Sequence, residues 1–337
     1  MPPLIREKHT VGWVCALPIE LAAAQEMLDE EHDTPPCETH DTNIYTCGRS
    51  GEHNVVIACL PSGQVGTNSA AAVASQMQSA FTNIRFGLMV GIGGGVPSEE
   101  ADIRLGDVVV SNPNQTHGGV VQYDFGKATA SGFHRTGFLN APPTILLNAV
   151  AKLQARHFRG KGILLEYVSR LEKLTEFDRK TAGPDALFDS GYDHTGGRTC
   201  DKCNNAYLVR RQTRAQKVVV YYGTIASGNR LMRSAAERDR FSAELGGVLC
   251  FEMEAAGLMN SFPCLVIRGI CDYADSHKNK RWQPYAAGTA AACAKELLSV
   301  IPAAEVMQTR RAEDAMNGAS SQSRGRIAID GASRLMS

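Results

Sequence analysis

Three acidic features follow short apolar runs, which is where α/β enzymes place catalytic groups, at the carboxyl ends of strands. Glu20 lies in the first turn of an expected helix, Pro18–Leu28, directly after an expected strand, Val11–Ala16. The helix dipole favours the ionised form of a carboxyl group at this position, so Glu20 is a candidate general base. Glutamate is also common in a first helical turn as a simple capping residue.

The second acidic feature is Phe251-Glu252-Met253-Glu254, which follows an expected strand over Gly247–Phe251 and precedes an expected helix. Two carboxylates two residues apart point in different directions, so we expect them to have different roles. One of them could accept hydrogen bonds from a sugar diol. The alternative is that both only stabilise the start of the helix.

The third acidic feature is Asp272, which ends the apolar run Cys264–Cys271. Partial burial there would raise the pKa of its carboxyl group, as a general acid near neutral pH requires. The alternative is a cap of a helix or turn. Arg268 lies inside the same run and needs a buried partner if it faces the core.

A glycine-rich segment, Gly91–Gly95, follows the expected buried strand Phe86–Ile92. It lacks the spacing of the dinucleotide-binding fingerprint, which argues against an oxidoreductase of that type. We expect a tight turn at which a ligand can approach the backbone closely.

Cys200-x-x-Cys203, with His194 upstream, has part of the spacing of a zinc site. A structural zinc needs four ligands and this segment supplies three, so we interpret it as a polar loop and expect no metal and no cofactor. Most of the ten cysteines lie within or beside apolar stretches. They are therefore expected to be small buried side chains in a reducing compartment, the cytoplasm.

The elements that must position these residues alternate between apolar runs and helical patterns, which predicts an α/β domain with a mainly buried sheet. The further expected strands are Ile44–Cys47, Asn54–Leu60 (antiparallel to each other), Asp107–Ser111, Lys217–Tyr222 and Cys264–Ile270. The further expected helices are Ser69–Gln78, Ala141–Arg156 and Tyr285–Val300. We expect one domain over residues 1–301, with a partly structured insertion at 160–215 and a disordered tail at 302–337.

The composition excludes several classes of protein. The chain of 337 residues carries 35 basic and 35 acidic side chains, so it lacks the overall positive charge of a nucleic-acid-binding protein. No apolar run reaches the roughly 18 residues of a membrane span. The polar start has no apolar signal core, which also favours the cytoplasm.

Together, these segments resemble the purine and uridine phosphorylase superfamily, and within it the nucleosidase branch. The likeness covers residues 10 to 300, and its motifs are VGWVCALPIEL (11–21), LMVGIGGGVP (88–97), LGDVVVS (105–111), GTIASGN (223–229), CFEMEAAG (250–257) and VIRGICDYAD (266–275). GGVVQYDFGK (118–127) and FLNAPP (138–143) carry a closer likeness to a fungal module found in front of NACHT-type ATPase domains.

The resemblance implies a three-layer α/β/α sandwich with a central mixed sheet, and a homodimer or larger homo-oligomer. It also implies a site that binds a purine nucleoside or nucleotide. Glu20 matches the residue that activates the attacking water, and Asp272 matches the acid that assists the leaving base at N7. The implied substrate-binding residues are Glu254 on the ribose hydroxyls, Met253 against the sugar, Glu252 beside them, Gly93 and Gly94 beneath the sugar, and Ala226 and Ser227 near the base.

The same resemblance favours hydrolysis over phosphorolysis. Ala16–Glu20 contains no arginine and places a carboxylate where a phosphate dianion would be repelled, and the loop Gly63–Asn68 also lacks arginine. We therefore expect a purine nucleoside hydrolase that yields free base and ribose. The alternatives are a purine nucleoside phosphorylase, a nucleosidase acting on AMP or ATP through the basic segment Asp275–Arg281, and a non-catalytic nucleoside-sensing module.

Overall fold

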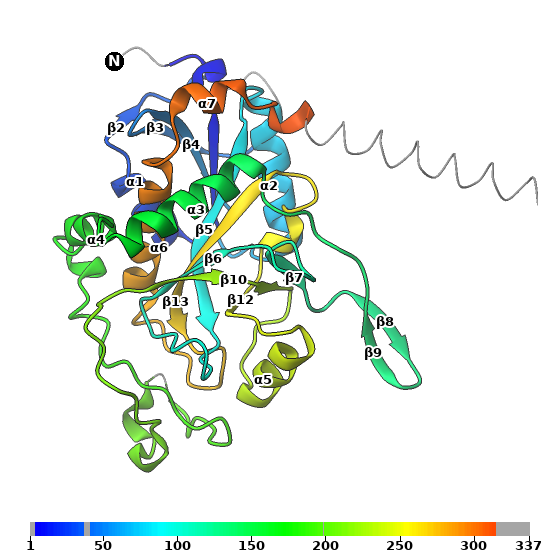
Figure 1. Cartoon of the computed structure of the whole chain (residues 1–337), viewed down its shortest axis with the longest axis vertical. Helices are drawn as coiled ribbons and strands as arrows, with labels where there is room; N and C mark the ends of the chain where they lie inside the picture. The colour runs from blue at the N-terminus through cyan, green and yellow to red at the C-terminus, as the bar shows by residue number, and fades with distance from the viewer. Residues whose placement is uncertain (1–3, 37–40, 198, 315–337) are drawn as a thin grey trace, which may run out of the picture.

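The computed structural model describes residues 4–36, 41–197 and 199–314 of the chain (Figure 1). The strands are β1 Val11–Cys15, β2 Glu30–His32, β3 Tyr45–Ser50, β4 His53–Cys59, β5 Phe86–Gly95, β6 Val108–Ser111, β7 Val120–Gln122, β8 Gly126–Thr129, β9 Gly132–Arg135, β10 Val220–Gly223, β11 Ile225–Ser227, β12 Cys250–Glu252 and β13 Cys264–Asp272. The α-helices are α1 Pro18–Glu26, α2 Thr67–Ala80, α3 Thr144–Phe158, α4 Leu164–Leu171, α5 Ala235–Glu244, α6 Gln283–Leu298 and α7 Ala303–Gln308. Short 3-10 helices include Cys200–Lys202 and Ala255–Gly257.

A large mixed sheet forms the centre of the molecule, in the order β10-β6-β13-β5-β1-β4-β3-β2. Its middle strands β13, β5, β1 and β4 are parallel, and β12 pairs antiparallel with the end of β5. Every residue of β1 is buried, as expected for strands that are covered on both faces. The carboxyl ends of β1, β5 and β13 therefore meet at one edge.

Helices cover both faces of this sheet (Figure 1). Helix α6 packs on β13 and β5 and is itself covered by α1, α3 and α4, so most of it is buried. This burial is expected because its sequence is apolar nearly all round. Helix α2 packs on β1 and β4 from the other face, with the Met77 side chain over Gly12. The predicted α/β architecture with a central mixed sheet is confirmed.

The segment at 160–215 is only partly regular. Helix α4 buries Leu164, Val168 and Leu171 against α6, and the chain then crosses to the end of the molecule toward which β5 and β13 point (Figure 1). An ion pair fixes the end of this crossing, with Arg214 Nη2 2.6 Å from Asp107 Oδ1.

Three expectations from the sequence are wrong in detail. Residues Gly91–Gly95 belong to β5 and form no turn. Only a 3-10 helix, Ala255–Gly257, follows β12 where we expected an α-helix. The segment after residue 302 begins with helix α7, and Val306 and Ala312 are buried in the hydrophobic core. The Ala312 N–H also donates to the Ile84 carbonyl at 2.8 Å. Residues 315–337 of the expected tail lie outside the described residues.

Within the described part of the chain, no helix combines the length and apolar character that a bilayer crossing requires.

Candidate active site

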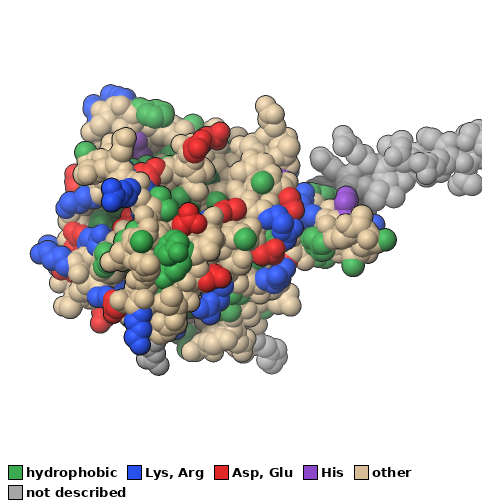
Figure 2. Space-filling model, turned by 90° about the horizontal axis from the view of Figure 1, so that it is seen from below, with side chains coloured by type: hydrophobic (Ala, Val, Ile, Leu, Met, Phe, Trp, Pro, Cys, Tyr) green, Lys and Arg blue, Asp and Glu red, His purple; other side chains and the backbone are tan. Residues whose placement is uncertain are grey.

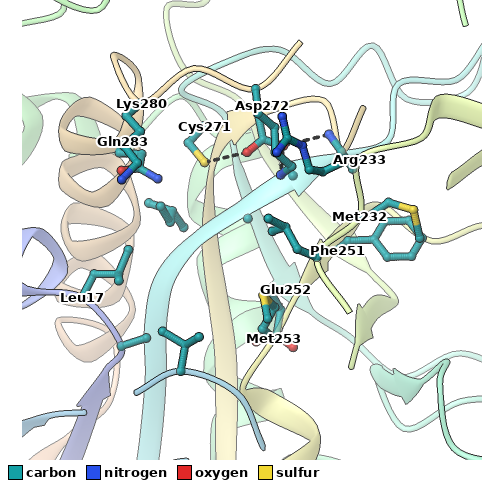
Figure 3. Close-up of a pocket in the computed structure, with 18 of the residues that line it drawn as sticks. Leu17, Met232, Arg233, Phe251, Glu252, Met253, Cys271, Asp272, Lys280 and Gln283 are labelled. Carbon is teal, nitrogen blue, oxygen red and sulfur yellow. Dashed lines mark hydrogen bonds and ion pairs between the residues drawn. The ribbon is translucent and has the colours of Figure 1, made fainter. Parts of the chain in front are cut away.

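A cavity of about 480 Å³ opens where β1, β5 and β13 end (Figure 3). The residues predicted from the sequence that line it are Glu20, Gly93, Gly94, Glu252, Met253, Glu254 and Asp272. They come from four separate motifs of the sequence. The fold therefore brings most of the predicted site residues to one place.

The glycines of β5 explain how these side chains can meet. The carboxyl end of β5 lies between β12 and β13, and Gly94 is paired with Phe251 on one side and with Asp272 on the other. A Cβ atom on Gly91 would lie 2.4 Å from Glu20 Oε1 and 2.5 Å from Arg268 Nη1, and one on Gly94 would lie 2.7 Å from Asp272 Oδ1. Glycine is required here because side chains from neighbouring elements occupy the space above the strand.

Glu20 is buried at the amino end of α1, with 3% of its surface exposed. Its carboxylate accepts hydrogen bonds from the backbone N–H groups of Ala16 at 2.7 Å, Leu17 at 3.0 Å and Ile92 at 2.8 Å. Burial nevertheless raises the pKa of Glu20, against the opposing effects of Arg268 and of these N–H donors. The helix dipole also favours the ionised form of this carboxyl group, but desolvation is the largest effect and acts in the opposite direction.

Arg268 is the centre of a buried charge cluster. It forms an ion pair with Glu252 and lies 3.6 Å from Glu254, and none of its surface is exposed. Burial alone would lower the pKa of Arg268, but Glu252, Glu254 and Glu20 together raise it above its ordinary value. This confirms that the arginine needs buried partners, and it gives Glu252 the additional role of holding Arg268.

Glu252 also holds the segment that follows it. Its carboxylate accepts hydrogen bonds from the backbone N–H of Glu254 at 3.1 Å and of Ala255 at 3.0 Å. Glu254 in turn accepts from the Gly66 N–H at 3.2 Å. Burial raises the pKa of Glu254 to about 7, with Glu252 adding to the shift and Arg268 opposing it.

Asp272 lines the cavity from the end of β13, next to Lys278. A β-bulge interrupts the β13–β5 register between Ile270 and Asp272, and bulges of this kind turn side chains toward active sites. The Asp272 carboxylate accepts from the Ala274 N–H at 2.8 Å and lies 2.7 Å from the ammonium of Lys278. Among the described residues outside glycine, Ala274 alone has a positive φ, 52°, so the loop is bent tightly around this carboxylate.

Comparisons with known proteins fit this arrangement. The sequence profile of the Phosphorylase superfamily matches residues 10–299. The chain belongs to the phosphorylase superfamily. A nucleotide-binding leucine-rich repeat (NLR)-like protein of the fungus Hyaloscypha variabilis is 51% identical over 306 residues, which are 89% of this chain and 30% of that relative. The chain thus spans less than a third of the length of this relative.

Nucleosidases are among the other relatives within the superfamily. A 5'-methylthioadenosine/S-adenosylhomocysteine nucleosidase of Mycobacterium bovis is 26% identical over 87% of this chain and 97% of that protein. ATP nucleosidase Cap17 of Escherichia coli is 25% identical over 82% of this chain and 48% of that protein. The structure of a 5'-methylthioadenosine/S-adenosylhomocysteine nucleosidase from Colwellia psychrerythraea, solved with adenine, superposes with a TM-score of 0.57 and 18% identity over 88% of this chain and 98% of that chain.

Two residues carried over from the superfamily resemblance do not line the cavity. Ala226 is buried in an apolar cluster with Phe251 and Ala274, and the Ser227 hydroxyl accepts the Ala256 N–H at 2.9 Å. Strand β11 pairs with β12 in the same sheet, so Ala226 and Ser227 lie one strand away from Phe251 and Glu252, which line the cavity. That their segment borders the base stays a prediction.

Further cationic and apolar residues complete the wall. Sequence reasoning missed the segment Arg230–Arg233, which lines the cavity directly after the superfamily motif GTIASGN. Lys278, Asn279 and Lys280 also line it, and they belong to the basic segment that the nucleotide alternative invoked. Arg230 and Arg233, which follow this motif directly, were the signal in the sequence that could have identified the segment Arg230–Arg233. Figure 2 views the molecule from this end, and lysine and arginine side chains alternate with acidic ones across it.

Proposed function

We propose that this chain is a purine nucleoside hydrolase, which cleaves the N-glycosidic bond to give free base and ribose. The observation that carries the proposal is that Glu20, Glu254 and Asp272 line one cavity although they lie far apart in the sequence. Glu20 and Glu254 belong to the buried group around Arg268, whereas Asp272 lies at the end of β13 beside Lys278, so the site can act on the sugar and on the base at once. The nucleosidase relatives support the same class of reaction.

Glu20 is the general base of the proposed reaction. Hydrolysis proceeds through an oxocarbenium-like sugar, so a nucleophile must be ready on the face opposite the leaving base. Three backbone N–H groups fix the Glu20 carboxylate, and burial raises its pKa toward the working pH, where a general base is most effective. Glu20 takes a proton from water as the water oxygen bonds to C1′.

Asp272 acts on the other product. As the bond between C1′ and N9 breaks, its electron pair enters the purine, and a proton at N7 makes the base a neutral leaving group. Asp272 faces the cavity with its carboxylate fixed by Ala274 and Lys278, and it supplies that proton or hydrogen bond. Glu254 accepts hydrogen bonds from the ribose 2′ and 3′ hydroxyls, and Met253 packs against the sugar beside it.

The charge of the cavity favours water over phosphate as the nucleophile. Glu20, Glu252 and Glu254 surround the single guanidinium of Arg268, so this wall carries excess negative charge when the carboxyl groups are ionised. A phosphate dianion placed beside Glu20 would be repelled. The phosphorylase alternative therefore lacks the cationic anion site that it needs on this side of the sugar.

The test is to incubate the purified chain with adenosine, inosine, guanosine, AMP and ATP, each with and without phosphate. Chromatography would identify the base and the sugar product. Base together with free ribose, without added phosphate, is the expected result. Base release only with phosphate, as ribose 1-phosphate, would make the chain a phosphorylase. Binding of a nucleoside by calorimetry without any cleavage would support the sensing module instead.

Nucleotides are a second candidate class of substrate. Four cationic residues line the cavity, namely Lys278, Lys280, Arg230 and Arg233, and one relative is an ATP nucleosidase. Lys280, Arg230 and Arg233 are exposed, so they lie where phosphates of a bound nucleotide could remain partly in solvent. The same panel ranks AMP and ATP against the nucleosides and decides between these two classes.

A further inference from the structure

Two cysteines and two histidines gather outside the cavity, where the segment 160–215 meets the loop after β13. His194 Nδ1 lies 3.2 Å from Cys203 Sγ and 4.0 Å from Cys200 Sγ. One ligand atom from each of His194, Cys203 and His277 lies within 4.8 Å of the others. We call these four residues the Cys–His cluster. From the sequence we counted three of them and expected no metal, because the fourth, His277, joins only through the fold.

The spacing of these atoms suits a small cation. Zinc binds thiolate sulfur at about 2.3 Å and imidazole nitrogen at about 2.0–2.1 Å, so ligand atoms of a tetrahedral site lie about 3.3–3.8 Å apart. The distances from His194 to the two sulfurs bracket this range. Cys200 and Cys203 are held in one 3-10 turn by the hydrogen bond from the Cys203 N–H to the Cys200 carbonyl, at 3.0 Å.

His277 supplies an independent observation. Its side chain is 4% exposed, Nε2 has no hydrogen-bond partner in the described structure, and Nδ1 has only the Asp275 carboxylate, 3.5 Å away. A buried imidazole nitrogen without a partner is costly, and such groups call for a ligand. The ring stacks on Phe188, with centroids 4.2 Å apart, so its plane is fixed.

Outer groups orient both imidazoles in the way that metal sites require. His194 Nε2 lies 3.3 Å from the Gly197 carbonyl, which leaves Nδ1 for the metal. Asp275 Oδ2 lies 3.5 Å from His277 Nδ1, so a metal would take the other nitrogen. Carbonyl and carboxylate partners of this kind fix the tautomer of metal-binding histidines.

We propose that His194, Cys200, Cys203 and His277 bind one structural Zn²⁺ in a tetrahedral Cys₂His₂ site. A set of two thiolates and two imidazoles binds zinc in preference to harder divalent cations, which prefer oxygen ligands. With four protein ligands the site keeps no open position for substrate or water, so its role is structural. Atoms balance because binding releases the thiol protons to solvent.

The consequence is a cross-link between two distant parts of the chain. His194 and both cysteines belong to the segment 160–215, whereas His277 adjoins Lys278, which pairs with Asp272. The His194 N–H also donates to Ser276 Oγ at 3.0 Å, and the Cys200 thiol to the His277 carbonyl at 3.9 Å. A zinc ion here would fix the loop that forms the cationic wall of the cavity.

The first test is the metal content of the full chain, purified without a histidine tag and measured by inductively coupled plasma mass spectrometry. We expect about one zinc per chain, which strong chelators remove only slowly or on unfolding. After exchange with Co²⁺, we expect the visible bands of tetrahedral cobalt and the near-ultraviolet absorption of a cobalt–thiolate bond. Wild-type protein with neither zinc nor this absorption after reconstitution would overturn the proposal.

Variants then assign the ligands. Cys203→Ser and His277→Asn should each lose most of the bound zinc and weaken the cobalt–thiolate spectrum, whereas Cys59→Ser, a half-buried free thiol at the end of β4, should keep both. Circular dichroism checks that each variant is folded. A Cys203→Ser chain that retains stoichiometric zinc, or a Cys200–Cys203 disulfide found by thiol titration of the purified protein, would contradict the site.

Discussion

The two walls of the cavity are built in different ways. The carboxylate wall consists of Glu20, Glu252 and Glu254, which are buried together with Arg268, the cation that Glu252 and Glu254 face. Glu20 lies in the first turn of α1, Glu252 ends β12, Glu254 follows it, and Arg268 lies within β13. The cationic wall consists of Arg230–Arg233 and Lys278–Lys280, which lie on loops and are largely exposed. Asp272 stands where the two walls meet, at the last residue of β13.

This difference separates chemistry from selection. A charge on a rigid, desolvated element is held in one geometry, which the proposed bond cleavage requires. A charge on a solvated loop interacts more weakly with a ligand and is more easily replaced by mutation, which suits recognition of the part of the substrate that varies. The following predictions test whether the walls divide the work in this way.

The largest effect is expected at Glu20. Glu20→Gln should lower kcat for nucleoside hydrolysis by about 10²–10⁴-fold, because the amide cannot take a proton from water. The amide NH₂ would also face a backbone N–H that now meets a carboxylate oxygen, so thermal unfolding must show that the variant is folded. Base release is measured by chromatography.

The matched control makes the same change at an exposed site. Glu244→Gln removes a carboxylate on α5 that pairs only with Arg240 at 2.8 Å, and its kcat should equal that of the wild type. A folded Glu20→Gln enzyme with full activity would show that the carboxylate wall does not supply the base.

The next effect concerns stability. Arg268→Met leaves Glu252 and Glu254 as buried carboxyl groups without their cation, and breaking a buried pair in this way costs about 3–5 kcal/mol. We expect the free energy of unfolding in urea to fall by that amount. Arg240→Met on exposed α5 should change it by less than about 0.5 kcal/mol. Equal small losses in both would mean that the carboxylate wall is not held by Arg268.

Much of the carboxylate wall could be predicted from the sequence because its signals are local. Glu20, Glu252 and Asp272 each come at or just after the end of an apolar run, Glu254 follows two residues after Glu252, and the strands at Val11–Cys15 and Cys264–Asp272 are where those runs predict them. The need of Arg268 for a buried partner followed from its place inside such a run. Which carboxylates would provide it depended on strand order, which the sequence does not contain.

The errors have a common physical cause. The segment Gly91–Gly95 has the composition of a turn, but its pairing with β13 on one side and β12 on the other makes it part of strand β5. His277 joins the Cys–His cluster only after the chain has folded. In each case a contact between distant residues overrides the local pattern.

The pH dependence sharpens the view of the carboxylate wall. Glu254 must be ionised to accept hydrogen bonds from two ribose hydroxyls, and its pKa is raised to about 7 by burial. We therefore expect kcat/KM for adenosine to fall about tenfold per pH unit as the pH is lowered below this value. Stopped assays between pH 5.5 and 8.5 measure it. A rate that is constant across this range would contradict the role of Glu254.

Protein stability should move in the opposite direction with pH. A carboxyl group whose folded pKa is about 7, against 4.5 in the unfolded chain, binds its proton more tightly when folded. Its contribution to stability is complete below pH 4.5 and is lost as the pH rises through 7. Urea unfolding at pH 6 and pH 8 should show a larger loss in the wild type than in Glu254→Gln, whose amide does not titrate, while Glu20 with its raised pKa contributes in both proteins.

The smallest effect is expected on the cationic wall. Lys280→Ala combined with Arg233→Ala should raise KM for ATP by about tenfold, because two exposed cations each contribute little in water. KM for adenosine, which has no phosphates, should stay within about twofold. The effect on ATP should shrink as salt rises, since exposed charges are screened.

The control pair Arg159→Ala and Lys161→Ala removes two exposed cations outside the cavity and should leave both KM values unchanged. Loss of adenosine and ATP turnover to the same extent would mean that these loops position the sugar or base as well, and that the two walls do not divide chemistry from selection.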